Sequence, residues 1–148
     1  MTQKELVLNN PRYIILHHSL TKDSETVSWQ AIRRYHVNTL KWRDIGYHWG
    51  LELINNRHEI LVGRMMNDTG AHCRQNGMNR MSFGICHIGN FDLDKPPVEM
   101  WLMSLHFSRT LMDMFNIPRA NVMGHREFAD YKTCPGLMWN LSKYRDQL

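Results

Sequence analysis

Histidine and cysteine side chains gather at three places in this sequence of 148 residues, which contains nine histidines and three cysteines. The three segments are His17-His18-Ser19, Gly124-His125-Arg126 and Lys132-Thr133-Cys134-Pro135-Gly136. Imidazole and thiolate are ligands that zinc prefers, whereas magnesium and calcium prefer oxygen. A catalytic zinc keeps three protein ligands and one open position, and it lowers the pKa of bound water to about 7. Two histidines and one cysteine would satisfy that count.

The spacing of these residues is not by itself a zinc signature. His125 and Cys134 are nine positions apart, His17 is more than a hundred residues away, and no CxxC or HExxH pattern is present. His17 and His18 are also adjacent, and side chains alternate between the two faces of a strand. Only one of this pair can therefore face the other ligands, and the residues alone leave the choice open.

Several short motifs then occur in the order in which one enzyme family carries them. They are His17-x-Ser19, Gly46-Tyr47-His48-Trp49, Gly70-Ala71-His72, Asn79-x-x-Ser82-x-Gly84-Ile85, and Gly124-His125-Arg126 with Thr133-Cys134-Pro135-Gly136. From about residue 13 onward the chain resembles the zinc-dependent N-acetylmuramoyl-L-alanine amidases of the type 2 family. That family includes amidase-type phage lysozymes and peptidoglycan recognition proteins. The resemblance implies hydrolysis of the amide bond between N-acetylmuramic acid and L-alanine in peptidoglycan.

The resemblance also implies roles for individual residues. One zinc ion per chain would be held by His17, His125 and Cys134, because the His-x-Ser motif selects the first histidine of the adjacent pair. Tyr47 stands where the family keeps a catalytic tyrosine. Lys132, two positions before the cysteine, matches the lysine with which phage amidases stabilise the transition state. The residues alone would allow a plain strand aromatic and a solvated loop lysine at these two positions.

Three further residues are predicted to bind the substrate. His72 and Asn79 belong to an irregular segment over residues 65–81, which is rich in glycine and asparagine. Arg64 follows a predicted hairpin strand, and its guanidinium suits a peptide carboxylate. A surface histidine and a surface ion pair are the alternative interpretations of His72 and Arg64.

Short apolar runs alternate with helical patterns and predict the scaffold that positions these residues. We expect a single α/β (α+β) domain over residues 12–148, with a central mixed β-sheet flanked by helices, after a lead-in over residues 1–11. Strands are predicted over residues 12–17, 49–54, 59–62, 82–88 and 120–123. Helices are predicted over residues 28–38, 94–115 and near the C-terminus, with a polar loop over residues 20–26. Strand ends and the loops after them are where such a scaffold presents functional groups.

Charge and hydropathy limit the partners. Eighteen Lys and Arg against 14 Asp and Glu give a net charge of +4 without a dense basic block. We therefore expect attraction to an anionic cell wall, with no nucleic acid bound. We also expect a monomer. No apolar run approaches the roughly 20 residues that span a bilayer, so we expect no membrane insertion.

The polar start of the sequence lacks the apolar region of a signal peptide. We expect synthesis in the host cytoplasm and action on the periplasmic wall after another protein permeabilises the membrane, as for a phage or prophage endolysin that lyses its host. Three alternatives stay open. They are a bacterial housekeeping amidase, a module that binds muropeptides without cutting them, and an additional regulatory role through a protein partner.

Overall fold

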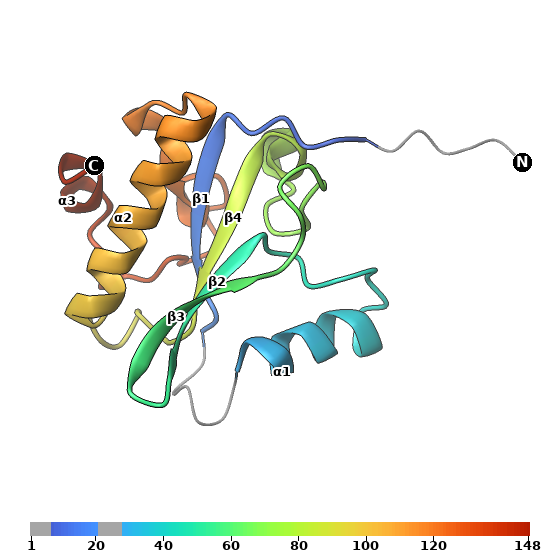
Figure 1. Cartoon of the computed structure of the whole chain (residues 1–148), viewed down its shortest axis with the longest axis horizontal. Helices are drawn as coiled ribbons and strands as arrows, with labels where there is room; N and C mark the ends of the chain where they lie inside the picture. Colours follow the sequence, from blue (N-terminus) through green and yellow to red (C-terminus); the bar gives the residue numbers. More distant parts are fainter. Residues whose placement is uncertain (1–6, 21–27) are drawn as a thin grey trace, which may run out of the picture.

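The computed structural model describes residues 7–20 and 28–148, and these form one five-stranded sheet with helices on both faces (Figure 1). The strand order is β3-β2-β4-β1-β5. The strands are β1 (Tyr13–His18), β2 (Trp49–Ile54), β3 (Arg57–Val62), β4 (Ser82–His87) and β5 (Val122–Gly124). The start of the predicted lead-in and nearly all of the predicted loop over residues 20–26 lie outside the described residues.

The sheet is mixed, as predicted. Parallel pairs join β1 to β4, β1 to β5 and β2 to β4, whereas β2 and β3 form an antiparallel hairpin. Asn55 and Asn56 make the hairpin turn with φ values of 50° and 63°. Asparagine tolerates this left-handed region, and two such residues match the twist of the flanking strands. The turn is tighter than the four-residue connection expected from the sequence.

Three α-helices flank the sheet within the described residues. They are α1 (Trp29–Arg34), α2 (Val98–Phe115) and α3 (Leu141–Asp146). Ser28 caps α1 by accepting a hydrogen bond from the Ala31 amide, and Asn140 caps α3 in the same way. The predicted first helix is realised as α1 followed by a π-helical segment, Tyr35–Thr39. Among the described residues, we find no helix with the length and apolar character needed to cross a bilayer.

The two faces of the sheet carry different side chains. Helices α2 and α3 cover one face, whereas α1 lies on the other (Figure 1). Ile14 and Leu16 of β1 belong to the main core under α2 and α3, whereas Ile15 packs with Cys73 and Met78 in a separate cluster. The period-two alternation of β1 thus places His17 on the face opposite the main core.

Two predicted segments differ in detail. The last strand begins at Val122, because the preceding Arg119–Asn121 forms a 3₁₀ turn. The irregular segment over residues 65–81 contains a 3₁₀ helix, Gln75–Arg80, that is broken by positive φ at Asn76 and Gly77. Neither of these 3₁₀ segments has an apolar periodicity from which a regular element could be predicted.

Candidate metal site and its pocket

Three predicted ligands meet where β1 and β5 end. Leu16 pairs with Gly124 in the parallel register, so His17 and His125 follow side by side, with ring centroids 4.7 Å apart. Cys134 comes from the loop before α3, and the ligand atoms of the three residues all lie within 4.8 Å of one another. This separation and this donor set suit one zinc ion held by three protein ligands.

The adjacent histidine has a different environment. Nδ1 of His18 accepts a hydrogen bond from the backbone amide of Phe91 at 3.1 Å, and the two rings stack at 6.1 Å. Nε2 of His18 lies 3.4 Å from Oγ1 of Thr133. The structure therefore brings His17, and not His18, to the other two ligands.

The loop that carries Lys132 and Cys134 is tied down on both sides. The carboxylate of Asp92 accepts hydrogen bonds from Oγ1 of Thr133 and from the amide of Leu137, both at 2.9 Å. The Arg126 amide donates to the carbonyl of Cys134 at 2.9 Å. Its guanidinium donates to the carbonyls of Gly136 and of Trp139. These bonds fix a short irregular segment that has no sheet or helix ladder of its own.

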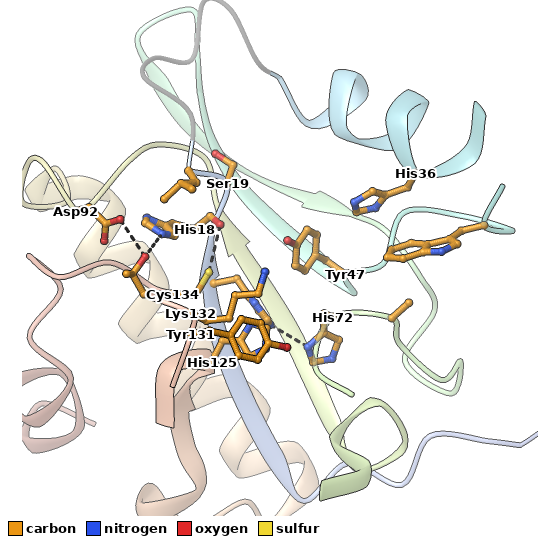
Figure 2. A pocket seen from close by; sticks show the side chains of 15 residues that line it. His18, Ser19, His36, Tyr47, His72, Asp92, His125, Tyr131, Lys132 and Cys134 are labelled. Atoms are coloured by element: carbon orange, nitrogen blue, oxygen red, sulfur yellow. Dashed lines mark hydrogen bonds between the residues drawn. The ribbon is translucent and has the colours of Figure 1, made fainter. Parts of the chain in front are cut away.

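A cavity of about 570 Å³ opens over the three ligands, and Tyr47 and Lys132 line it (Figure 2). The Tyr47 ring lies 5.1 Å from the ring of His17, centroid to centroid. Burial raises the pKa of Tyr47 well above its ordinary value, so its hydroxyl stays a hydrogen-bond donor at neutral pH. Lys132 also lines the cavity, with Nζ 5.6 Å from the centre of the Tyr131 ring.

The electrostatics of the site favour ligand forms that bind a cation. Burial lowers the pKa of His17 well below its ordinary value, and the neighbouring His72 and His125 lower it further. Burial and the nearby Lys132 bring the pKa of His125 to about 4. Both imidazoles are therefore neutral at pH 7, which is the form that ligates metal. Burial raises the pKa of the Cys134 thiol, and a bound cation would reverse this by favouring the thiolate.

Comparison with known proteins identifies relatives of this chain. A family model described as N-acetylmuramoyl-L-alanine amidase matches residues 8–137. The chain belongs to this family. Its relatives include an endolysin of Enterobacteria phage K11, which is 29% identical over 129 residues and is matched over 81% of this chain and 77% of the relative. Peptidoglycan-recognition protein SC1a of Drosophila melanogaster is 29% identical over 135 residues, covering 86% of this chain and 70% of the relative.

Solved structures of the same family share the fold. The N-acetylmuramoyl-L-alanine amidase LysC from Clostridium intestinale superposes with a TM-score of 0.80 at 27% identity, covering 94% of this chain and 85% of that chain. Drosophila PGRP-LB gives a TM-score of 0.72 at 27% identity, with coverages of 89% and 78%. The predicted family and the predicted mixed α/β fold are thereby confirmed.

The three residues predicted to bind substrate in this amidase-family domain lie in different settings. His72 lines the cavity, but its side chain is 8% exposed and its Nδ1 lies 2.9 Å from Nε2 of His17. Oδ1 of Asn79 accepts hydrogen bonds from the amides of His72 and Cys73, so it holds the backbone of this loop. Asn79 also lines a smaller adjoining hollow of about 240 Å³.

Arg64 is not brought to either hollow. Its guanidinium donates to the backbone carbonyls of Ile45 at 2.9 Å, Thr69 at 2.7 Å and Asp44 at 3.5 Å, and the residue is 7% exposed. A buried guanidinium that is bonded to three carbonyls braces the segments around it. The sequence signal for Arg64 was its type and its place after a strand, which cannot distinguish a brace from a substrate ligand.

Sequence reasoning missed Gln75, whose side-chain amide links His125 to Tyr131. Its Oε1 lies 3.4 Å from Nε2 of His125, and its Nε2 donates to the hydroxyl of Tyr131 at 2.8 Å. Trp42 and Tyr131, also missed, line both hollows. Tyr131 adjoins the predicted Lys132 in the sequence, but Gln75 and Trp42 carry no local signal, because only the fold brings them to the site.

Proposed function

We propose that this protein is a zinc-dependent hydrolase that cleaves the amide bond between N-acetylmuramic acid and L-alanine in peptidoglycan. The observation that carries the proposal is the convergence of His17, His125 and Cys134 in one cavity that Tyr47 and Lys132 also line. Membership of the amidase family supplies the bond to be cleaved.

The donor set fits zinc. Two neutral imidazoles and one thiolate are borderline-to-soft ligands, and the set contains none of the oxygen donors that calcium and magnesium require. Zinc held by His17, His125 and Cys134 would polarise the scissile carbonyl and activate water for attack. The protein supplies the remaining parts of the reaction.

Lys132 and Tyr47 are the residues proposed to act on the reacting atoms. Attack on the amide creates negative charge on the carbonyl oxygen, and a positioned donor stabilises that charge more in the transition state than in the substrate. The ammonium of Lys132 supplies a positive charge at the cavity wall. The protonated hydroxyl of Tyr47, which lines the same cavity, supplies a hydrogen bond.

The cavity accommodates a fragment of a muropeptide. Ligand pockets commonly span about 300 to 1,000 Å³ with a few directed polar groups, and this cavity measures about 570 Å³. Trp42 and Tyr131 line it with flat aromatic surfaces that suit the apolar faces of sugar rings. We propose a monomer that binds peptidoglycan through this groove, in which His72 and Asn79 support the wall. Arg64 is left out of this assignment.

Endolysins of Enterobacteria phage K11 and Klebsiella phage KP32 are among the relatives. We therefore propose that the protein serves as a phage or prophage endolysin, made in the host cytoplasm and reaching the wall after the membrane is permeabilised. Expression in a Gram-negative host with and without a pore-forming membrane protein tests this setting. Lysis only when both are present is expected, and lysis that never occurs would contradict the role.

Hydrolysis is tested on purified sacculi. The zinc-loaded protein should release stem peptides that carry a new free amino group on L-alanine, while Cys134→Ala should release none. Peptidoglycan recognition proteins among the relatives make binding without cleavage the competing function. Wild-type protein that sediments with sacculi but releases no peptide, beside an active reference amidase, would establish that alternative.

A further inference from the structure

The ring of His72 is clamped between two glycines. A Cβ atom built on Gly70 or on Gly84 would lie 2.5 Å from a ring carbon of His72, which is closer than real contacts allow. The backbone of His72 is held as well, because its amide donates to Oδ1 of Asn79 at 2.8 Å. The two glycines and the backbone bond thus hold this ring in place, and its two nitrogens have two different partners.

The donor and acceptor roles in the hydrogen bonds of this ring can be assigned, starting from a backbone carbonyl that can only accept. Oγ of Ser82 lies 2.7 Å from the carbonyl oxygen of Met78, which can only accept, so the single hydroxyl proton of Ser82 points there. Nε2 of His72 lies 3.4 Å from the same Oγ. Because Ser82 has no second proton to donate, Nε2 of His72 must carry the hydrogen in this contact.

The same reasoning assigns the protonated nitrogen of His17 at the proposed metal site. His17 and His72 are both buried, and burial disfavours the charged imidazolium, so each ring carries one proton at neutral pH. With the proton of His72 on Nε2, its Nδ1 offers only a lone pair. Nε2 of His17 lies 2.9 Å from that Nδ1 and must donate, which leaves Nδ1 of His17 with its lone pair.

We propose that Ser82 and His72 are positioning residues that fix His17 as its Nε2–H tautomer, so that its Nδ1 is available to the metal. The proposal rests on the zinc site proposed above. His125 has a matching arrangement, because its Nε2 lies 3.4 Å from Oε1 of Gln75, an acceptor. Partners that orient a ligating histidine typically change metal affinity by about 10- to 100-fold. His72 therefore acts through His17.

The tautomer is measured directly on metal-free protein by NMR correlation of the imidazole nitrogens and carbon-bound protons. Wild type should show His17 with its proton on Nε2 alone. In Ser82→Ala, His72 loses its acceptor and can move its proton to Nδ1, so His17 should become a mixture of both tautomers. Ser108→Ala is the matched control, because this buried serine bonds the Tyr144 hydroxyl away from the site.

Zinc affinity gives a second readout, by competition with a chelating dye. His72→Leu removes the acceptor and should weaken zinc binding by about 10- to 100-fold. His72→Asn can place an amide oxygen near the position of Nδ1 and should stay within a few-fold of wild type.

Equal weakening in both His72 variants would overturn the proposal, and so would a pure Nε2–H His17 in Ser82→Ala. If His72→Leu does not fold, the Ser82→Ala spectrum decides the matter. Wild type that binds no zinc would refute the proposed function, and the NMR result would still test the role of Ser82 and His72.

Discussion

Among single residues, the face of the strand to which a side chain points determines its task. His17 and His18 are neighbours in the chain, yet one meets His125 and Cys134 while the other receives the Phe91 amide. Burial keeps the imidazoles of the two proposed ligands, His17 and His125, neutral, so they need not lose a proton before they bind a cation. Because burial disfavours their protonated form, acid that protonates these histidines should destabilise the folded state.

Lys132 allows a test of charge stabilisation in the transition state. Lys132→Met should lower kcat/KM on soluble muropeptide by about 10²- to 10³-fold, the usual effect of removing one donor to an oxyanion. Zinc content should stay at the wild-type level, because the lysine is not a ligand. Lys143→Met, at an exposed position of α3, is the control with the same change in charge. A Lys132→Met enzyme with wild-type kcat/KM would remove this lysine from the mechanism.

His48 makes the folded state sensitive to pH. Burial lowers its pKa to about 4, and its Nε2 donates to the carbonyl of Asp68 at 2.8 Å. The unfolded chain binds the proton near pH 6.5, so the stability conferred by neutral His48 is complete above that pH and is lost as the pH falls toward 4. At pH 5 the loss should be about 2 kcal/mol.

Urea unfolding of wild type and His48→Gln at pH 7 and pH 5 measures this contribution. Glutamine can keep the bond to Asp68 without titrating, so the variant should lose less stability between the two pH values. An identical pH dependence in both proteins would mean that His48 is not the titrating group.

The types and order of the residues are enough to suggest a zinc site, and the family resemblance predicts which residues are its ligands. The ligand choice depends on strand alternation, which is a local property. The partners of those residues were beyond reach. Ser82 contacts His72 only because the chain between them folds back, and Gln75 meets His125 across 50 positions. Hydrogen-bond partners of this kind are fixed by packing between distant segments.

Among the elements, the loop between β5 and α3 carries both Lys132 and Cys134 and depends on tertiary bonds for its shape. Asp92, in the connection before α2, holds it at Thr133 and Leu137. Asp92→Ala should lower the free energy of unfolding by about 3 kcal/mol, since two hydrogen bonds to a charged group are lost and each contributes about 1.5–3 kcal/mol, the lower value applying at this half-buried position. Zinc affinity should fall as well, because Cys134 lies between the two bonded positions.

Calorimetry and dye competition on Asp92→Ala measure the two effects. Asp94→Ala, an exposed aspartate in the same connection, is the control and should resemble wild type. An Asp92→Ala protein with unchanged zinc affinity would show that the loop keeps its shape without this carboxylate.

The regular elements were largely predictable from pattern. Apolar runs located β1, β2 and β4, and the helix predicted over residues 94–115 corresponds to α2 (Val98–Phe115). The π-helical end of the first helix and the 3₁₀ turns were not predicted, because segments this short carry no apolar periodicity that would distinguish them from a loop or an α-helix.

At the scale of the whole molecule, the net charge of +4 should speed the encounter with an anionic wall. Salt screens this attraction, so kcat/KM on sacculi should fall between about 0.05 and 0.5 M sodium chloride. The turnover rate at saturating substrate should change little, because screening acts on association. Turbidity clearance at several salt concentrations measures this, and a flat kcat/KM would show that charge does not guide the encounter.

The zinc content of Cys134→Ala beside wild type tests the central claim most directly. Elemental analysis should give one zinc per chain in wild type and in Cys73→Ala, a control at another buried thiol, and none in Cys134→Ala. Zinc retained at wild-type level in Cys134→Ala would mean that this thiol is not a ligand, and the proposed site of His17, His125 and Cys134 would be wrong.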